Sequence, residues 1–289
     1  MLTGDDSMVQ TFRVVAWNCR RASRTSHAWD YLLELDPDVA LLQDFGKIPA
    51  SVSQVYSSTE DAAVIETGRP RRFGTGVLVK GTVDADLPMP APNEWVTQEL
   101  EILKGNFVAK AVTLHNGFRL NIISVYSPAR PIDPLRLQGI DTTGIQLTQN
   151  RNVWGTEILW ASLSAMNFKA DEAFIVGGDF NSSETFDDMW PGGPRGNREF
   201  IERMRALGLR DCLRSFKGQL TPTFRNPRGG QVIHQIDHLY ATEALLNILR
   251  RCDVGSAERV FASVPSLSDH LPIVADFSLD DGSSVSLDV

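Results

Sequence analysis

The sequence predicts an α/β fold in which two stacked β-sheets are covered by helices. Short apolar stretches rich in β-branched residues recur along the 289-residue chain, which is the pattern of many short strands. Two of these stretches, 107–114 and 119–126, are spaced as a β-hairpin, and helical periodicity is confined to a few segments. Many strands with few helices indicate two sheets packed face to face, with the helices on the outside.

The expected strands are the segments in which β-branched, aliphatic and aromatic residues dominate. Asn116 and Gly117 lie at the tip of the hairpin and predict a type I′ turn. The segments expected to be strands are Phe12–Trp17, Val39–Leu42, Gly76–Val79, Phe107–Leu114, Arg119–Tyr126, Ala173–Val176, Ile236–Tyr240 and Leu271–Phe277.

Three segments show the periodicity and end signals of helices. Ser26 is a suitable N-cap for a helix that runs to Leu35, just before the sequence reaches Pro37. Residues 148–166 predict a longer helix. Asn197 predicts the N-cap of a third helix, which Gly208 would end.

Composition predicts a single globular domain. Hydrophobic residues make up 42% of the chain and charged residues 22%, which excludes an intrinsically disordered protein. No Gly/Ser-rich linker, charge run or repeat interrupts the sequence. We therefore expect one domain over residues 12–278, with flexible tails at 1–11 and 279–289.

Several features predict a cytoplasmic protein. No apolar run reaches the roughly 18 to 20 residues that cross a bilayer, and the N-terminal residues lack the pattern of a secretory signal. Cys19, Cys212 and Cys252 are odd in number and far apart, which fits a reducing compartment rather than a disulfide framework. We expect no membrane partner, and the sequence indicates no protein partner.

The net charge of −8 argues against a protein that coats nucleic acid by bulk charge. It leaves open a local phosphate site that uses a bound cation. Three arginine clusters could follow a nucleic-acid backbone, although scattered solvated arginines explain each cluster equally well. These clusters are Arg20, Arg21 and Arg24; Arg69, Arg71 and Arg72; and Arg225 with Arg228.

In the first part of the chain, polar residues directly follow the expected strands. Late in the chain, polar residues lie at or just before the start of a strand instead. If the late strands run antiparallel to the early ones, all of these residues reach the same edge of the sheets. Oxygen ligands with a single imidazole suit Mg²⁺ or Mn²⁺ better than zinc. Each residue alone also fits an ordinary turn, but their joint occurrence favours a site. The set is Asn18, Asp44, Tyr126, Asp179, Asn181, Asp237, Asp269 and His270.

The motifs that contain these residues resemble the endonuclease/exonuclease/phosphatase superfamily, which includes DNase-I-like nucleases, abasic-site endonucleases, inositol-polyphosphate phosphatases and sphingomyelinases. The resemblance spans Phe12 to Phe277 and implies a four-layer α/β/β/α sandwich of two mixed, largely antiparallel sheets flanked by helices. The matching motifs, in order, are VVAWN, DPDVALLQD, IISVYSP, FIVGGDFNS, QIDHLYA and SLSDHLPIVADF.

The resemblance implies a site for Mg²⁺ or Mn²⁺ made by Asn18, Asp44 and Asp269. Asp44 stands where the family usually has a metal-binding Glu, so its carboxylate reaches one methylene less far. Arg20 replaces an acid that some members carry, which removes a possible ligand and adds a cation for the phosphate. These two departures leave weakened metal binding or a changed substrate open.

The same resemblance implies how the remaining residues handle water and phosphate. Asp179 would orient or deprotonate the attacking water, and Asn181 would hold that water and a phosphate oxygen. His270 would donate to a phosphate oxygen while Asp237 fixes its tautomer, and Tyr126 would touch the scissile phosphate. In-line attack of water needs these groups because negative charge grows on the phosphate oxygens during the reaction.

Three functions remain open from the sequence. The favoured one is a divalent-metal-dependent hydrolase that cleaves phosphodiester bonds, most simply a nuclease with DNA or RNA as substrate. The alternatives are a phosphatase or phosphodiesterase that acts on a small phosphate ester, and a non-catalytic phosphate-binding member.

Overall fold

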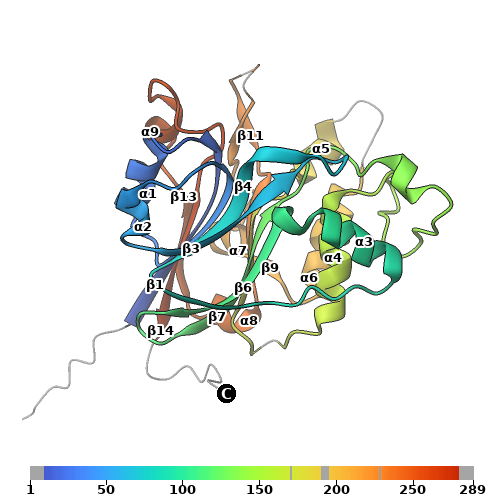
Figure 1. Cartoon of the computed structure of the whole chain (residues 1–289), viewed down its shortest axis with the longest axis horizontal. Helices are drawn as coiled ribbons and strands as arrows, with labels where there is room; N and C mark the ends of the chain where they lie inside the picture. Colours follow the sequence, from blue (N-terminus) through green and yellow to red (C-terminus); the bar gives the residue numbers. More distant parts are fainter. Residues whose placement is uncertain (1–9, 170, 190–194, 227, 229, 280–289) are drawn as a thin grey trace, which may run out of the picture.

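Two six-stranded sheets lie face to face in the middle of this computed structural model, which describes residues 10–169, 171–189, 195–226, 228 and 230–279 (Figure 1). The first sheet has the order β13 (Leu249–Val254), β14 (Ile273–Leu279), β1 (Gln10–Ala22), β2 (Val39–Phe45), β4 (Pro70–Val79) and β3 (Ser57–Val64). The second has the order β5 (Gly81–Asp86), β6 (Phe107–Leu114), β7 (Arg119–Tyr126), β8 (Phe174–Asp179), β12 (Asp237–Ala241) and β9 (Arg210–Asp211). A separate two-stranded ribbon joins β10 (Phe224–Arg225) to β11 (Val232–His234).

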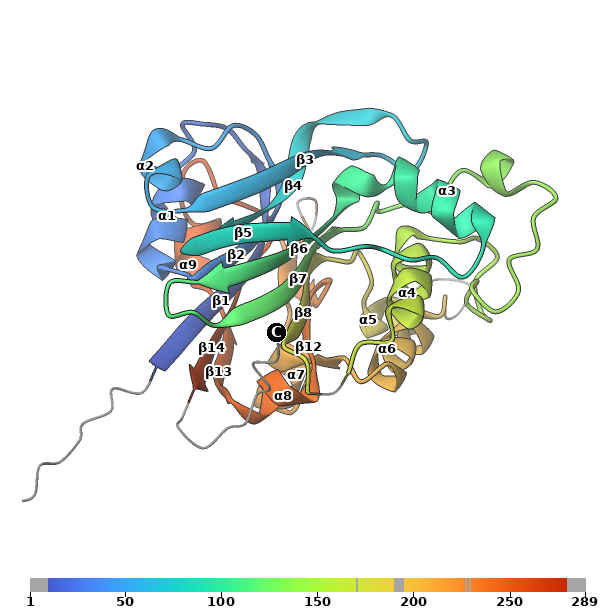
Figure 2. The same ribbon diagram turned by 60° about the horizontal axis from the view of Figure 1, so that its bottom comes forward.

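Helices cover the outer face of each sheet, as the two views show (Figures 1 and 2). The first sheet carries α1 (Ala28–Leu35), α2 (Ala50–Ser53) and α9 (Ala257–Phe261), and the second carries α3 (Glu94–Ile102), α4 (Gly155–Met166) and α6 (Asn197–Ala206). This arrangement confirms the predicted four-layer α/β/β/α sandwich. The remaining short elements are α5 (Glu184–Met189), α7 (Cys212–Lys217), α8 (Glu243–Asn247) and the 3-10 turns at Lys104–Asn106 and Pro134–Leu137.

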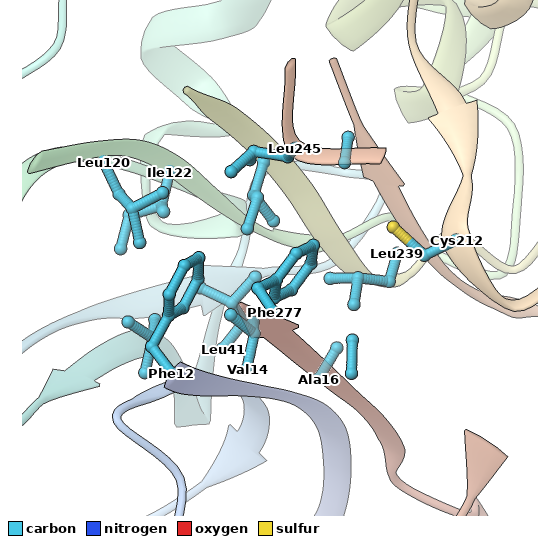
Figure 3. Packing of buried hydrophobic residues seen from close by; sticks show 14 of the residues in the cluster. Phe12, Val14, Ala16, Leu41, Leu120, Ile122, Cys212, Leu239, Leu245 and Phe277 are labelled. Carbon is cyan, nitrogen blue, oxygen red and sulfur yellow. The ribbon is translucent and has the colours of Figure 1, made fainter. Parts of the chain in front are cut away.

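Side-chain alternation along the strands builds three apolar layers between these four. In β1, Val14 and Ala16 face the second sheet, whereas Val15 and Trp17 face the outer helices. Figure 3 shows the layer between the sheets, where Phe12 and Phe277 stack with ring centroids 4.8 Å apart. Because both faces of β1 are buried, its apolar run is continuous, which made it recognisable in the sequence.

Every predicted strand segment lies in or overlaps a strand, but the predicted hairpin turn is wrong. Asn116 does not adopt the positive φ that a type I′ turn requires, and only Gly117 does, at 84°. The amide of Gly117 donates to the carbonyl of Leu114, so the connection is a three-residue loop that ends in a left-handed glycine.

All three helix starts also differ from the prediction. The N-cap of α1 is His27 and not Ser26, although the Ser26 hydroxyl accepts the backbone amide of Ala28 at 3.2 Å. The helix expected from residue 148 begins only at Gly155, because the Glu157 carboxylate accepts the backbone amides of Leu147 and Trp154 and folds the preceding segment back. Asn197 is the first residue of α6 rather than its cap, and its side chain bonds to Ser182 and Asp187.

The predicted tails lie mostly outside the described residues. Gln10 and Thr11, which were expected to belong to the first tail, pair with β14 at the start of β1, and Leu279 is the last residue of β14. Among the described residues, no helix is long and apolar enough to span a membrane.

Candidate active site

The polar residues singled out in the sequence gather at one end of the two central sheets. β14 runs antiparallel to β1, and β12 runs antiparallel to β8, which is the reversal that the prediction required. In the second sheet, Tyr126, Asp179 and Asp237 are direct neighbours across three strands. Asn18 and Asp44 come from the first sheet, and Asp269 and His270 come from the segment that leads into β14.

Irregular backbone aims several of these side chains. Asn18 and Asp44 lie inside strands rather than in turns, because β1 and β2 continue past them through register shifts. Of the six non-glycine residues with positive φ in the described chain, four belong to this region: Arg20, Arg21, Asp44 and Asn181. The other two end helices. Such concentrated backbone strain is typical of functional sites.

Asp179 is a buried carboxylate held by amides. Its Oδ2 accepts hydrogen bonds from Asn18 Nδ2 at 2.8 Å and from Asn181 Nδ2 at 3.1 Å, and its Oδ1 accepts the backbone amide of Asn181 at 3.0 Å. Burial raises the pKa of Asp179, while the charge on His270 lowers it. The side chain is therefore fixed in direction and poised to exchange a proton near neutral pH.

His270 and Asp237 form a hydrogen-bonded pair beside Asp179. The Nδ1 atom of His270 lies 3.0 Å from each carboxylate oxygen of Asp237, and both side chains are buried. Burial alone would lower the pKa of His270, but the carboxylates of Asp237 and Asp179 raise it to about 9. The imidazole is thus charged at neutral pH, with Nδ1 committed to Asp237 and Nε2 facing the site, 3.8 Å from Asp269 Oδ1.

Neighbouring groups fix this pair in place. Thr223 Oγ1 donates to Asp237 at 2.7 Å. Trp17 Nε1 donates to the backbone carbonyl of His270, and Ser268 Oγ accepts the backbone amide of His270 while donating to the carbonyl of Asn18. Motif reading missed the roles of Thr223 and Ser268, because neither hydroxyl touches the centre of the site.

Arg71 is the largest addition that the structure makes to the predicted site. Its guanidinium forms an ion pair with Asp44 at 2.9 Å, donates to the Tyr126 hydroxyl and lies 4.8 Å from the centroid of the Tyr126 ring. Burial raises the pKa of Asp44, and Arg71 opposes that rise. In the sequence, Arg71 was only one of several possible backbone-tracking arginines placed before a strand; it lies within β4.

The carboxylate oxygens of the site are suitable ligands for a hard divalent cation, but positively charged side chains already neutralise part of their charge. Asp179, Asp237 and His270 offer ligand atoms within 4.8 Å of one another. The side chains of Asp237 and His270 are hydrogen-bonded to each other, however, which makes them less available to a metal ion. Asp44 and Asp269 are the other two acids of the site, and their carboxylate oxygens can also bind a cation. Each has an arginine beside it, Arg71 on Asp44 and Arg20 on Asp269 at 3.4 Å.

The buried His238 is structural. Its Nδ1 lies 2.7 Å from Asp211, and its Nε2 lies 3.0 Å from the carbonyl of Ser182, so both nitrogens face acceptors. Burial alone would lower the pKa of His238, but Asp211 raises it. His238 thereby secures the segment that follows Asp179 and Asn181.

This arrangement can perform one kind of chemistry well. A fixed carboxylate can aim or deprotonate water, an imidazolium can stabilise negative charge on a phosphate oxygen, and the remaining acids can hold a cation. The three cysteines are buried and unpaired, and burial raises the pKa of Cys19 and Cys252, so none of them is set up as a thiolate nucleophile.

Comparisons with known proteins agree with this geometry. A family model described as the Endonuclease/Exonuclease/phosphatase family matches residues 15–270. A comparison with curated proteins finds no match. Similarity to solved structures extends over most of the chain.

An AP endonuclease from Archaeoglobus fulgidus has a TM-score of 0.66 and 18% identity, with 93% of this chain and 100% of that chain covered. The 3′ phosphatase NExo from Neisseria, bound to a product DNA hairpin, has a TM-score of 0.64 and 18% identity over the same shares. An AP endonuclease from Leishmania major has a TM-score of 0.62 and 15% identity, with 94% and 89% covered. At these identities the likeness establishes the fold.

Proposed function

This chain belongs to the endonuclease/exonuclease/phosphatase family, and we propose that it is a divalent-metal-dependent nuclease that cleaves phosphodiester bonds of DNA or RNA by in-line attack of water. The observation that carries the proposal is the buried trio of Asp179, Asp237 and His270, in which the carboxylate of Asp179 and the imidazole of His270 face one point. The comparisons support it, because the solved relatives include AP endonucleases and a 3′ phosphatase bound to DNA.

Asp179 is the proposed base. Its two amide partners, Asn18 and Asn181, hold the carboxylate without neutralising it, so it can orient a water and accept a proton from it. Asn181 also donates to the carbonyl of Ser127 at 2.8 Å, which anchors its amide between the strands β7 and β8. The water and the phosphate oxygen are thus presented to rigid donors and acceptors.

His270 is the proposed electrostatic clamp on the phosphate. Asp237 holds Nδ1 and stabilises the imidazolium, so the proton on Nε2 is available to a non-bridging phosphate oxygen. A preorganised donor of this kind stabilises the charge that develops in the transition state. Tyr126 is proposed to add a further contact to the scissile phosphate, with Arg71 fixing its hydroxyl. Arg20, on the rim beside Asp269, is proposed as another phosphate contact.

Asn18, Asp44 and Asp269 are the proposed ligands of Mg²⁺ or Mn²⁺. When bound, such an ion polarises the phosphoryl oxygen and stabilises the leaving oxygen. We favour these two ions because the ligands are oxygens, and Mn²⁺ tolerates the shorter reach of Asp44 better than Mg²⁺ does. We also propose a cytoplasmic location, supported by three buried, unpaired cysteines.

A metal-supplemented activity panel tests the proposal. The metal-stripped protein would be incubated with plasmid DNA, single-stranded RNA and p-nitrophenyl phosphate, each with EDTA, Mg²⁺ or Mn²⁺. Asp179→Ala is the inactive comparison, and Asp30→Asn, on an exposed face of α1, is the matched control for lost charge. Metal-dependent strand cleavage by wild type and Asp30→Asn, but not by Asp179→Ala, is the expected result.

Two outcomes would contradict it. Release of phosphate from the monoester with intact DNA and RNA would make the protein a phosphatase. Binding of oligonucleotide without turnover on any substrate, with either ion, would make it a phosphate-binding module.

A further inference from the structure

A cavity of about 640 Å³ opens beside Asn181. Its wall is built by the long segment between β7 and α4, by the residues that follow β8, and by the start of α6. The volume lies in the range of roughly 300 to 1,000 Å³ that is typical of small-molecule sites. None of the functions proposed above uses this space.

The lining has an unusual charge for this protein. It contains three arginines, Arg130, Arg151 and Arg195, and no acidic residue, although the whole chain carries a net charge of −8. Arg151 is exposed and, among the described residues, forms no ion pair. Arg130 has only a distant carboxylate, Glu66, at 3.9 Å. A cavity with this lining favours an anionic ligand.

Flat aromatic groups and amides make up much of the remaining wall. Trp154 and Phe186 line the cavity together with the amides of Asn150 and Asn152. Trp154 is half-buried, so part of its ring is open to a ligand in the cavity. Aromatic faces, amides and arginines together are the groups that recognise an unpaired base and its phosphate.

The cavity is continuous with the catalytic centre. Asn181 lines the cavity and also donates a hydrogen bond to Asp179. Its neighbours in sequence, Phe180 and Ser182, line the cavity as well. A strand whose scissile phosphate lies at Asp179 and His270 therefore brings its neighbouring nucleotide to the cavity mouth. A base that is paired and stacked in a duplex cannot enter such a space, whereas an unpaired one can.

We propose that this cavity binds one unpaired nucleotide next to the scissile phosphate, so that the enzyme prefers single-stranded nucleic acid to an intact duplex. This inference rests on the proposed nuclease function for its biological meaning. Binding, however, can be measured without turnover, and the two ideas therefore fail separately.

The test is fluorescence anisotropy with a labelled 12-nucleotide DNA strand, alone or annealed to its complement, in EDTA so that no cleavage occurs. Wild type should bind the single strand more tightly than the duplex. Arg151→Gln should weaken single-strand binding about fivefold to tenfold, as the loss of one charge-assisted contact does. Trp154→Leu, which keeps an apolar side chain but removes the aromatic face, should weaken it about fivefold or more.

Arg119→Gln is the matched control, because Arg119 is an exposed arginine outside the cavity, at the opposite end of β7 from Tyr126. It should bind both ligands like wild type. Bis(p-nitrophenyl) phosphate is a phosphodiester too small to need the cavity. If the proposed function holds, all variants should hydrolyse it at the wild-type rate. Absence of this hydrolysis in wild type would contradict the proposed function and leave the binding comparison intact.

Two results would overturn the inference. If the Arg151→Gln and Trp154→Leu variants bind the single strand as tightly as wild type does, the cavity does not hold a nucleotide. Equal weakening for single strand and duplex would show that Arg151 acts as a general surface charge instead.

Discussion

Replacing Arg71 by Gln should strengthen the binding of Mn²⁺, even though Arg71 lies in the middle of the candidate site. Its guanidinium forms an ion pair with Asp44 at 2.9 Å, and the two side chains are only 17% and 10% exposed. A cation that approaches Asp44 has to displace or share this partner. In the variant, the carboxylate has no internal competitor.

The magnitude follows from the attraction within the pair. Two unit charges about 4 Å apart attract by about 4 kcal/mol at an effective dielectric constant of about 20. If half of this attraction is given up when the ion binds, its removal strengthens binding by about 2 kcal/mol, or roughly thirtyfold in Kd. Because Arg71 opposes the raised pKa of Asp44, the variant should be measured at pH 8, where protonation competes least.

Isothermal titration calorimetry with Mn²⁺ on metal-stripped protein is the direct assay, and thermal unfolding would confirm that the variant is folded. Arg72→Gln is the matched control, since Arg72 is the exposed neighbour in the same strand. It should leave the Kd for Mn²⁺ unchanged. A folded Arg71→Gln variant with unchanged or weaker Mn²⁺ binding would refute the reasoning and show that Asp44 is not a ligand.

Three further perturbations test other parts of the structure. Asp179→Asn should lower turnover by roughly 10² to 10⁴ with little change in thermal stability, and a folded variant with wild-type turnover would assign the base to another acid. His270→Ala should cost roughly 10² or more in turnover, and adding Asp237→Ala should cost little beyond that; multiplicative losses in metal-saturated, folded proteins would mean that the two residues act independently. Burial raises the pKa of Glu157 to about 7, so its contribution to stability is present at low pH and is lost as pH rises from about 4.5 to about 7. The stability of wild type relative to Glu157→Gln should therefore fall across this window by about 3 kcal/mol and then level off, and a pH-independent difference in urea unfolding would contradict it.

The strands that could be predicted are those whose two faces are buried. β1, β2 and β8 each contain a continuous apolar run, because helices cover one side of it and the other sheet covers the opposite side. β3 and β5 escaped prediction because they are edge strands with acidic residues and exposed faces, as in SSTEDAAV and GTVDAD. Charged edge strands prevent pairing with other chains, and the same charge removes the apolar signal.

The acids and amides of the site were predictable because each stands at the end of a recognisable motif. The pairing of Arg71 with Asp44 was not, because it depends on the antiparallel register of β2 with β4 and on a shift in that register beside Asp44. The positive φ of Asp44 and Arg20 was hidden for a related reason. Neither residue is a glycine, so the sequence carried no local sign of a left-handed backbone.

The charges of the site single out one of its four acids. Asp44 is paired with Arg71, Asp269 with Arg20, and Asp237 with His270. Asp179 alone, among these described acids, is held by amides and forms no ion pair.

Burial raises the pKa of Asp179, and the charge on His270 and the hydrogen bonds from Asn18 and Asn181 offset only part of that rise. A cation bound beside Asp179 would therefore lower its pKa and favour the deprotonated carboxylate. This is the property that a base must have if it is to be switched on only when the site is complete.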